Sequence, residues 1–298
     1  MYKFNYAGQH FLLESEETLI PDFPLTVTLQ INRACNLKCV YCSEYQYFDE
    51  MSIEDVRKAV NNLYGINRII ISGGEPLLHK NLIDILKLCR EKFDVVALAT
   101  NAVLLTLNDA IEIVKYIDYF DVTIDGTRKI HNEIRGEFDG IIDGIRNISN
   151  ANGEFSVVSV LFNKNKDSII QVATIADTLG AKKLKILCPI PKGKGINIVG
   201  ERLSQEQNQE IYNSLVEAKN TFGYNLKILM TDWDKIKEGH AILIHPDGKV
   251  VASPVWTKEN CIDIIGNIYA NSIKEIWEDY PYKINHVNKY IEKTMMVC

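Results

Sequence analysis

Residues 25–42 read LTVTLQINRACNLKCVYC, and this stretch decides how the rest of the chain is interpreted. Its first seven residues are rich in β-branched and apolar side chains, which predicts a strand over Leu25–Ile31. Three cysteines follow directly in the spacing C-x3-C-x2-C, at Cys35, Cys39 and Cys42. Thiols so closely spaced predict a metal site in the loop after the strand, because clustered cysteines in a reducing compartment are more often ligands than bridges.

The same kind of apolar run recurs along the chain and alternates with amphipathic stretches. Further strands are predicted at 68–71, 95–99, 119–124, 155–161 and 184–187, and helices at 52–64, 81–92, 106–115, 140–150 and 167–179. Strands that alternate with helices indicate βαβ units and a parallel sheet. With right-handed crossovers, the expected fold is α/β, a partial (β/α)6 TIM-like barrel whose loops after the strands form the working face.

Composition narrows the class of protein. The chain has 298 residues, 46% hydrophobic residues, seven cysteines and a formal net charge of −6. It can bury a core without disulfides, and its charge makes nucleic acid an unlikely partner. No apolar run reaches the roughly 18 residues that a membrane span needs, and the first residues do not form a signal peptide. We therefore expect no membrane contact and a cytoplasmic location.

The character of the sequence changes after Leu187. Prolines and glycines mark a loop, a helix is predicted at 204–220, and 241–252 has the pattern of a hairpin around His245-Pro246-Asp247-Gly248. Two more helices are expected at 272–280 and 282–293. We divide the chain into an N-terminal extension (1–24), a barrel (25–200) and a C-terminal region (201–298).

The kind of metal follows from the ligand spacing. Structural zinc prefers four closed ligands, often in two pairs, and no second CxxC or HxxxH pair follows the three cysteines. Three thiolates suit a four-iron, four-sulfur cluster with one iron left open for a substrate or cofactor.

The three-cysteine motif, with Tyr41 before its last cysteine, resembles that of the radical S-adenosylmethionine (SAM) superfamily. The segment Gly73-Gly74-Glu75-Pro76 after the second strand resembles the GGEP motif of the same family. The resemblance implies one 4Fe-4S cluster on Cys35, Cys39 and Cys42. It also implies bound SAM, which is cleaved to a 5′-deoxyadenosyl radical that abstracts a substrate hydrogen. A lone turn with two glycines would have an ordinary structural explanation.

Other segments extend the resemblance. Residues 99–102 resemble the TNG segment, and Val122–Gly126 with His131 and Arg135 resembles the SIDG…H…RG stretch of peptide-modifying members. By resemblance, the GGEP glutamate region holds the SAM amino group, Thr123 approaches the ribose, Arg135 the carboxylate and Tyr41 the adenine. The full set of expected cofactor-binding residues is Tyr41, Gly73, Gly74, Glu75, Pro76, Asn101, Thr123 and Arg135. The alternatives are a plain turn at Asp125-Gly126 and a surface ion pair for Arg135.

Residues 244–251, 266–269 and 272–277 resemble the frame of SPASM and twitch extensions. In that frame, auxiliary iron–sulfur clusters need cysteines on both sides of the hairpin. Here the later position is Ser253, and there is no cysteine between Cys188 and Gly248. We expect a degenerate extension, and an auxiliary cluster is doubtful.

Four cysteines remain. Cys89 lies on the apolar face of a predicted helix and is expected to be buried. Cys188 follows the sixth strand and should face the mouth of the barrel. Cys261 and Cys298 lie in the C-terminal region. Cys188, Cys261 and Cys298 could ligate an unusual auxiliary cluster or be inert. Alternatively, Cys188 or Cys261 could return a hydrogen to a substrate radical, as a cysteine does in radical epimerases.

These features predict a radical SAM enzyme acting on a ribosomally made peptide, by epimerisation, crosslinking or a related reaction. The 24 residues before the first strand are too few for a fused leader-binding domain, so a separate peptide carrier could be needed. An electron donor such as flavodoxin or ferredoxin is the other implied partner. The alternatives are a radical epimerase or dehydrogenase of a sugar or other small molecule, and a non-enzymatic metal-binding protein.

Overall fold

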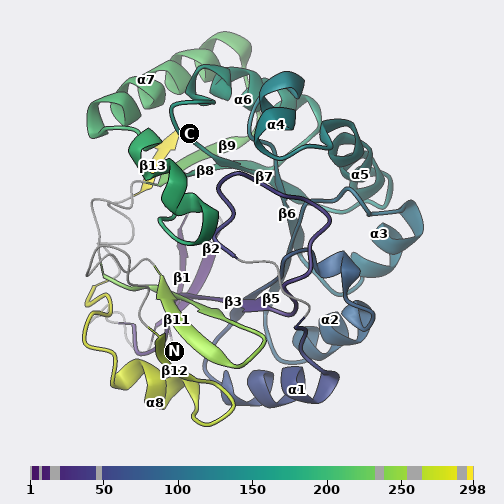
Figure 1. Cartoon of the computed structure of the whole chain (residues 1–298), viewed down its shortest axis with the longest axis vertical. Helices are drawn as coiled ribbons and strands as arrows, with labels where there is room; N and C mark the ends of the chain where they lie inside the picture. The colour runs from purple at the N-terminus through teal and green to yellow at the C-terminus, as the bar shows by residue number, and fades with distance from the viewer. Residues whose placement is uncertain are drawn as a thin grey trace.

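A curled sheet forms the centre of the computed structural model, which describes residues 2–6, 9–13, 21–44, 49–231, 238–253, 264–286 and 294–297 (Figure 1). Among these residues the sheet has eleven strands in the order β12-β11-β10-β3-β4-β5-β6-β7-β8-β9-β13. Strands β3 to β9 run parallel to one another, and β13 pairs antiparallel with β9. The predicted α/β partial barrel is therefore confirmed.

The six predicted strands are all present: β3 (Thr26–Gln30), β4 (Arg68–Ser72), β5 (Val95–Thr100), β6 (Tyr119–Thr123), β7 (Phe155–Val160) and β8 (Lys183–Leu187). Three strands of this sheet were not predicted from the sequence: β9 (Lys227–Thr231), β12 (Ile264–Asn267) and β13 (Thr294–Val297). Strands β1 (Tyr2–Tyr6) and β2 (Gln9–Leu13), which pair antiparallel as a separate sheet, were not predicted either.

Helices cover the outer face of the curled sheet (Figure 1). They are α1 (Ile53–Asn62), α2 (Leu82–Arg90), α3 (Leu107–Ile113), α4 (Arg128–Ile134), α5 (Phe138–Asn150), α6 (Ile169–Thr178) and α7 (Gln205–Phe222). Short 3-10 helices are η1 (Pro76–Leu78), η2 (Lys166–Ser168) and η3 (Gly193–Glu201). The starts of α1, α3 and α7 are fixed by capping boxes at Ser52, Thr106 and Ser204, which satisfy main-chain N–H groups that a helix start leaves unpaired.

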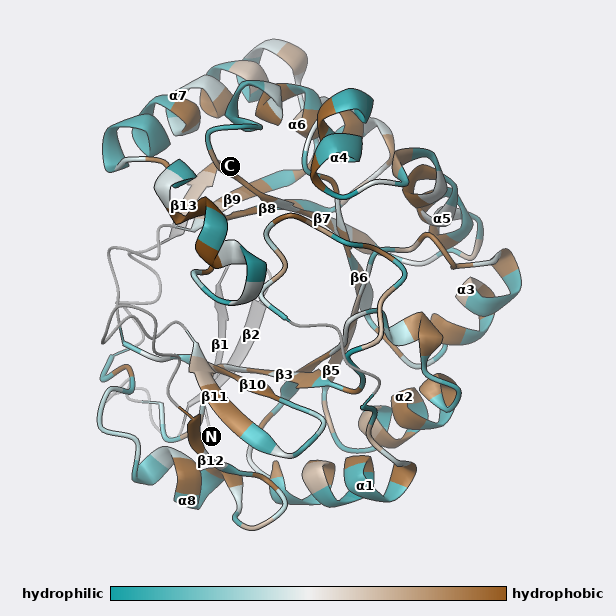
Figure 2. Ribbon diagram, viewed as in Figure 1, coloured by the Kyte–Doolittle hydropathy of each residue, from teal (hydrophilic) through white to brown (hydrophobic). Residues whose placement is uncertain are grey.

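The strands have two different faces. Leu29, Ile71 and Val122 are fully buried among the residues of the main hydrophobic core. Their neighbours Gln30, Ser72 and Thr123 line a cavity on the concave side of the sheet. Side chains alternate between the two faces of a strand, so each strand contributes one apolar face to the core and one face to the cavity. Figure 2 shows that the outer helices mix hydrophilic and hydrophobic residues, as helices packed on one side of a sheet do.

The predicted hairpin is β10 (Ala241–Ile244) and β11 (Lys249–Ser253). It joins the barrel sheet directly, because β10 pairs parallel with β3, from Ala241 opposite Thr26 to Ile244 opposite Leu29. Strand β12 (Ile264–Asn267) adds to β11, and the short α8 (Ile273–Glu278) lies within the predicted helix 272–280.

The helix predicted at 282–293 is wrong over residues 282–286, and the remainder lies outside the described residues. Lys283 instead forms an isolated bridge with Gly239. Its ammonium group donates to the carbonyls of Trp277 and Glu278 at 2.8 Å each. These bonds satisfy unpaired carbonyls at the end of α8 and direct the chain away from a new helix.

Candidate active site

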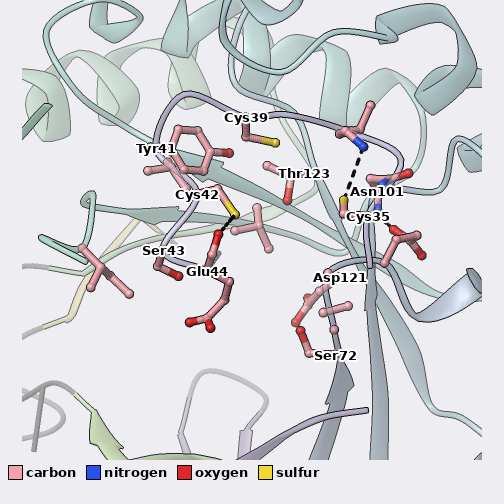
Figure 3. Close-up of a pocket in the computed structure, with 18 of the residues that line it drawn as sticks. Cys35, Cys39, Tyr41, Cys42, Ser43, Glu44, Ser72, Asn101, Asp121 and Thr123 are labelled. Carbon is pink, nitrogen blue, oxygen red and sulfur yellow. Dashed lines mark hydrogen bonds between the residues drawn. The ribbon is translucent and has the colours of Figure 1, made fainter. Parts of the chain in front are cut away.

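The three predicted ligands lie in the loop that follows β3. Cys39 is buried, and Cys35 and Cys42 are half-buried. The loop is tightened by a main-chain bond from Cys42 N to Cys39 O at 3.3 Å and by Leu37 N donating to Cys35 Sγ at 3.4 Å. Figure 3 shows all three thiols around one pocket. Burial, with smaller contributions from Glu75, Cys39 and Cys42, raises the pKa of the Cys35 thiol to about 11.

The cavity that these thiols line has a volume of about 430 Å³, within the range of small-molecule and cofactor sites. Among the described residues, no three His, Cys, Asp or Glu side chains converge as ligands of a single metal ion. Cys35, Cys39 and Cys42 line one cavity, as the ligands of a multinuclear cluster do when each thiolate binds a different iron. The donor set of this loop therefore fits a 4Fe-4S cluster.

The two glycines after β4 are required by the cysteine loop itself. A Cβ on Gly73 would lie 2.1 Å from Asn32 Oδ1, and one on Gly74 would lie 2.3 Å from the Ala34 carbonyl. Gly74 N and Glu75 N donate to the carbonyls of Asn32 and Ala34 at 2.9 and 2.7 Å. We expected the glycines to admit a ligand, and they also allow two backbone segments to pack together.

Glu75 is the centre of a buried hydrogen-bond network. Its carboxylate accepts from Thr100 Oγ1 at 2.6 Å, Asn101 N at 2.7 Å and Leu77 N at 3.0 Å. Burial raises the pKa of Glu75, and these three donors oppose that effect. A carboxylate has about four lone-pair directions, so one remains for a further donor in the cavity that Glu75 lines.

Tyr41 links two buried charged groups. Its hydroxyl donates to Asp125 Oδ2 and accepts from Arg135 Nη1, both at 2.5 Å. Asp125 Oδ1 also accepts from Val160 N at 2.7 Å. Arg135 is thus a buried member of this network, 3.7 Å from Asp125, and not a surface ion pair. Its Nε is buried without a hydrogen-bond partner among the described residues, which leaves a donor for an anionic group.

Asn101 and Thr123 also lie on the cavity wall. The Asn101 side chain donates to Asn36 Oδ1 at 2.8 Å and so connects the loop after β5 to the cysteine loop. Pro76 is buried at the start of η1 and does not line the cavity. The structure therefore brings together every expected cofactor-binding residue except Pro76.

The remaining cysteines have different positions. Cys188 lies on the cavity wall after β8, and Arg202 Nη2 donates to its sulfur at 3.7 Å. Cys89 is fully buried in α2, as predicted, and burial raises the pKa of its thiol to about 12. Cys261 and Cys298 lie outside the described residues.

Two ion pairs at the cavity were not predicted from the sequence, although their carboxylates, Asp121 and Glu44, line it. Asp121 on β6 binds Lys185 on β8, whose ammonium group donates to both carboxylate oxygens at 2.7 and 2.9 Å. Glu44 pairs with Lys192, and both lie near His245 of the hairpin. A charged residue inside an apolar strand, as at Asp121 and Lys185, was the available signal. The partners of Glu44 had no such signal, because they come from segments far apart in the sequence.

Comparison with known proteins gives the class. Residues 29–175 match the Radical SAM superfamily model. The chain is 27% identical over 219 residues to Fe-coproporphyrin III synthase of Methanosarcina barkeri, covering 69% of this chain and 55% of that protein. It is 26% identical over 289 residues to the antilisterial bacteriocin subtilosin biosynthesis protein AlbA of Bacillus subtilis, covering 92% and 63%. The chain thus spans somewhat over half the length of these relatives.

The fold agrees with the sequence match. The crystal structure of Streptococcus suis SuiB bound to precursor peptide SuiA is similar with a TM-score of 0.73, at 16% identity, covering 90% of this chain and 67% of that one. Residues 29–175 of the chain form a radical SAM domain. None of the described helices is long and apolar enough to cross a membrane.

Proposed function

We propose that the protein cleaves SAM reductively and removes a hydrogen atom from a peptide substrate. The observation that carries this proposal is the single cavity lined by three cysteine thiols, Glu75 and Arg135. When bound, the cluster and SAM supply one-electron cleavage of a carbon–sulfur bond and the 5′-deoxyadenosyl radical that results.

The residues of the chain then have distinct roles. The remaining lone pair of Glu75 accepts from the SAM amino group, and Arg135 faces the carboxylate with its unused Nε donor. Asp125 and Tyr41 hold the guanidinium in place. Buried and multiply bonded side chains cost little reorganisation when a ligand binds, so this wall is preorganised for a zwitterionic group.

The relatives favour a peptide over a small molecule as the substrate. The match to AlbA, a protein of bacteriocin biosynthesis, extends over 92% of the chain and so includes the C-terminal region. The match to Fe-coproporphyrin III synthase covers 69%. Because of this second relative, a carboxylated small molecule is the other candidate substrate.

Cys188 is the candidate hydrogen donor in an epimerisation. Its sulfur–hydrogen bond would break as a new bond forms to the substrate carbon radical. The sulfur radical would then take one electron from the external reductant and one proton from solvent. Its place on the cavity wall supports this role, whereas the predicted role of Cys261 falls on a residue outside the described part of the chain.

The first experiment is anaerobic reconstitution with iron and sulfide, reduction, and quantitation of 5′-deoxyadenosine by mass spectrometry. We expect about four irons per chain and 5′-deoxyadenosine formation that requires both SAM and reductant. A protein that binds the iron but forms no 5′-deoxyadenosine would overturn the proposed activity.

The second experiment concerns the substrate. Peptides encoded by short reading frames beside the gene and a tetrapyrrole precursor of Fe-coproporphyrin III are supplied separately, in deuterated water. A peptide that loses two hydrogens, gains a crosslink or gains carbon-bound deuterium supports a peptide substrate. If the substrate gains carbon-bound deuterium with the wild type but not with Cys188→Ala, Cys188 is the hydrogen donor. Turnover of the tetrapyrrole precursor with every peptide unchanged would contradict the peptide assignment.

A further inference from the structure

Glu44 is held by a residue far away in the sequence. It lies two residues beyond Cys42 on the cavity wall, and its side chain is 15% exposed. The ammonium group of Lys192, in the loop between β8 and η3, donates to Glu44 Oε1. A carboxylate so poorly exposed is costly without a partner, so this lysine stabilises the end of the cysteine loop in its present position.

The main chain around Lys192 packs on the same loop. Lys194 N donates to the Cys42 carbonyl at 2.9 Å. Gly193 has a φ of +56°, and a Cβ there would lie 2.7 Å from the Cys42 and Ser43 carbonyl oxygens. Residues 192–195 therefore lie backbone against backbone on the last part of the cysteine loop, a contact that only glycine permits at position 193.

His245 connects the C-terminal hairpin to this contact. Its Nε2 lies 3.4 Å from Lys192 Nζ, its Nδ1 lies 2.7 Å from Gln30 Oε1, and it is 3.8 Å from Glu44. Burial and the charge of Lys192 lower the pKa of His245 to about 4. A neutral imidazole that accepts from Lys192 at Nε2 carries its proton on Nδ1 and donates it to Gln30.

We propose that Lys192 and His245 are positioning residues that act through Glu44 to hold the cysteine loop closed around its cluster. Glu44, Lys192 and His245 form the loop clamp. The clamp makes retention of iron depend on the β8–η3 loop and on the C-terminal hairpin. It rests on the proposed function only in that the three cysteines bind an iron–sulfur cluster.

The test measures the rate at which reconstituted protein loses iron to a ferrous chelator under anaerobic conditions. Partners that orient metal ligands typically contribute 10- to 100-fold to metal affinity, so we expect Lys192→Met and Glu44→Gln to release iron about tenfold faster. Lys194→Met is the matched control. It removes the same charge two residues away, its side chain is exposed, and its contact with Cys42 is through the main chain, so its release rate should stay that of the wild type.

The exchanged pair Glu44→Lys with Lys192→Glu should restore slow release, because it rebuilds the ion pair with reversed charges. Thermal unfolding of the iron-free proteins separates a loosened loop from a misfolded chain. Paramagnetic resonance of the reduced cluster, with and without SAM, should change in the single variants and return in the exchanged pair.

Release from Lys192→Met at the rate of Lys194→Met would overturn the clamp. The clamp would also be overturned if the exchanged pair released iron fast while its unfolding temperature equalled that of the wild type. Neither result affects 5′-deoxyadenosine formation by the wild-type protein, and failure of that reaction leaves the iron-release comparison intact. The two proposals can therefore fail independently.

Discussion

The carboxylates at the cavity are held in two different ways. Glu75 lines the cavity and Asp125 accepts from the lining residue Tyr41; both carboxylates are buried and also accept bonds from main-chain N–H groups, those of Asn101 and Val160 among them. Asp121 and Glu44 line the cavity as well, and they pair with the side chains of Lys185 and Lys192. We call the first pair of carboxylates, together with Cys35, Asn101 and Arg135, the main-chain wall, and the second pair the lysine wall.

The difference shows how each carboxylate responds to a single substitution. Main-chain donors are fixed by the strands and turns themselves, so no side-chain substitution removes them. A side-chain partner, in contrast, can be removed by one mutation without rebuilding a turn. The carboxylates of the lysine wall therefore depend on single lysines, and loss of one lysine leaves a poorly exposed charge without its partner.

The largest expected effect tests the ligand set of the main-chain wall. Cys35→Ser should lose nearly all cluster iron and all 5′-deoxyadenosine formation, because a cluster on three thiolates cannot spare one. Iron quantitation and visible absorption measure the loss. Cys89→Ala is the control and should retain full iron, since Cys89 is buried in α2 and does not line the cavity.

The second prediction concerns the lysine wall. Lys185→Met leaves the Asp121 carboxylate, whose side chain is 9% exposed, without its partner. We expect the free energy of unfolding to fall by about 3 kcal/mol, measured by urea denaturation. Adding Asp121→Asn should recover at least half of the loss. A loss below about 0.5 kcal/mol would mean that the pair behaves like a solvated surface pair.

The third prediction tests how closely the main-chain wall is packed. A Cβ on Gly144 of α5 would lie 2.1 Å from the carbonyl of Ala102, in the loop that carries Asn101. Gly144→Ala should therefore destabilise the protein by about 2 kcal/mol. Gly140→Ala on the same helix meets its nearest atom, in the Val103 side chain, at 3.3 Å and should be neutral or stabilising. Equal unfolding curves for the two variants would contradict this packing.

The smallest effect is on the pH dependence of stability. Burial and the charge of Arg135 lower the pKa of His131 from 6.5 to about 3. The unfolded chain then binds more protons between these two values, so stability falls as the pH falls through 6.5 and levels off near 3. Between pH 7 and pH 5.5, His131 should lower the free energy of unfolding by about 1 kcal/mol.

The check is the unfolding free energy of the wild type and His131→Asn at both pH values. Asparagine retains an oxygen for the Asp125 N–H, which donates to His131 Nδ1 at 3.1 Å, but it does not titrate. Between pH 7 and pH 5.5, the free energy of unfolding of His131→Asn should therefore fall by less than that of the wild type. The same slope in both proteins would show that His131 is not the responsible group.

Much of the main-chain wall could be predicted from the sequence, for a physical reason. Cys35, Glu75 and Asn101 each follow a strand by a few residues, and parallel strands bring their carboxyl ends to one edge. Residues that follow different strands of the sequence are therefore close together in the fold, and this could be predicted. Arg135 instead follows helix α4, and its place at the site was expected only from the resemblance of its motif.

The lysine wall could not be predicted in this way. Glu44, Lys192 and His245 are separated by 148 and 53 residues, and only the assembled sheet brings them together. Strands β9 and β13 were missed for a related reason. They are short, and their pairing with β8 and with each other is what defines them. Their residues alone carry little periodic pattern.

The pairing of β10 with β3 has a consequence for the order in which the molecule assembles. One edge of β3 faces β4, and the other faces residues more than 200 positions later in the chain. During synthesis this second edge has no strand to pair with until the hairpin has emerged. An open edge next to a loop of three thiols is exposed to pairing with other chains and to oxidation. The iron–sulfur loop therefore becomes protected late, when the last strands of the sheet close on its first.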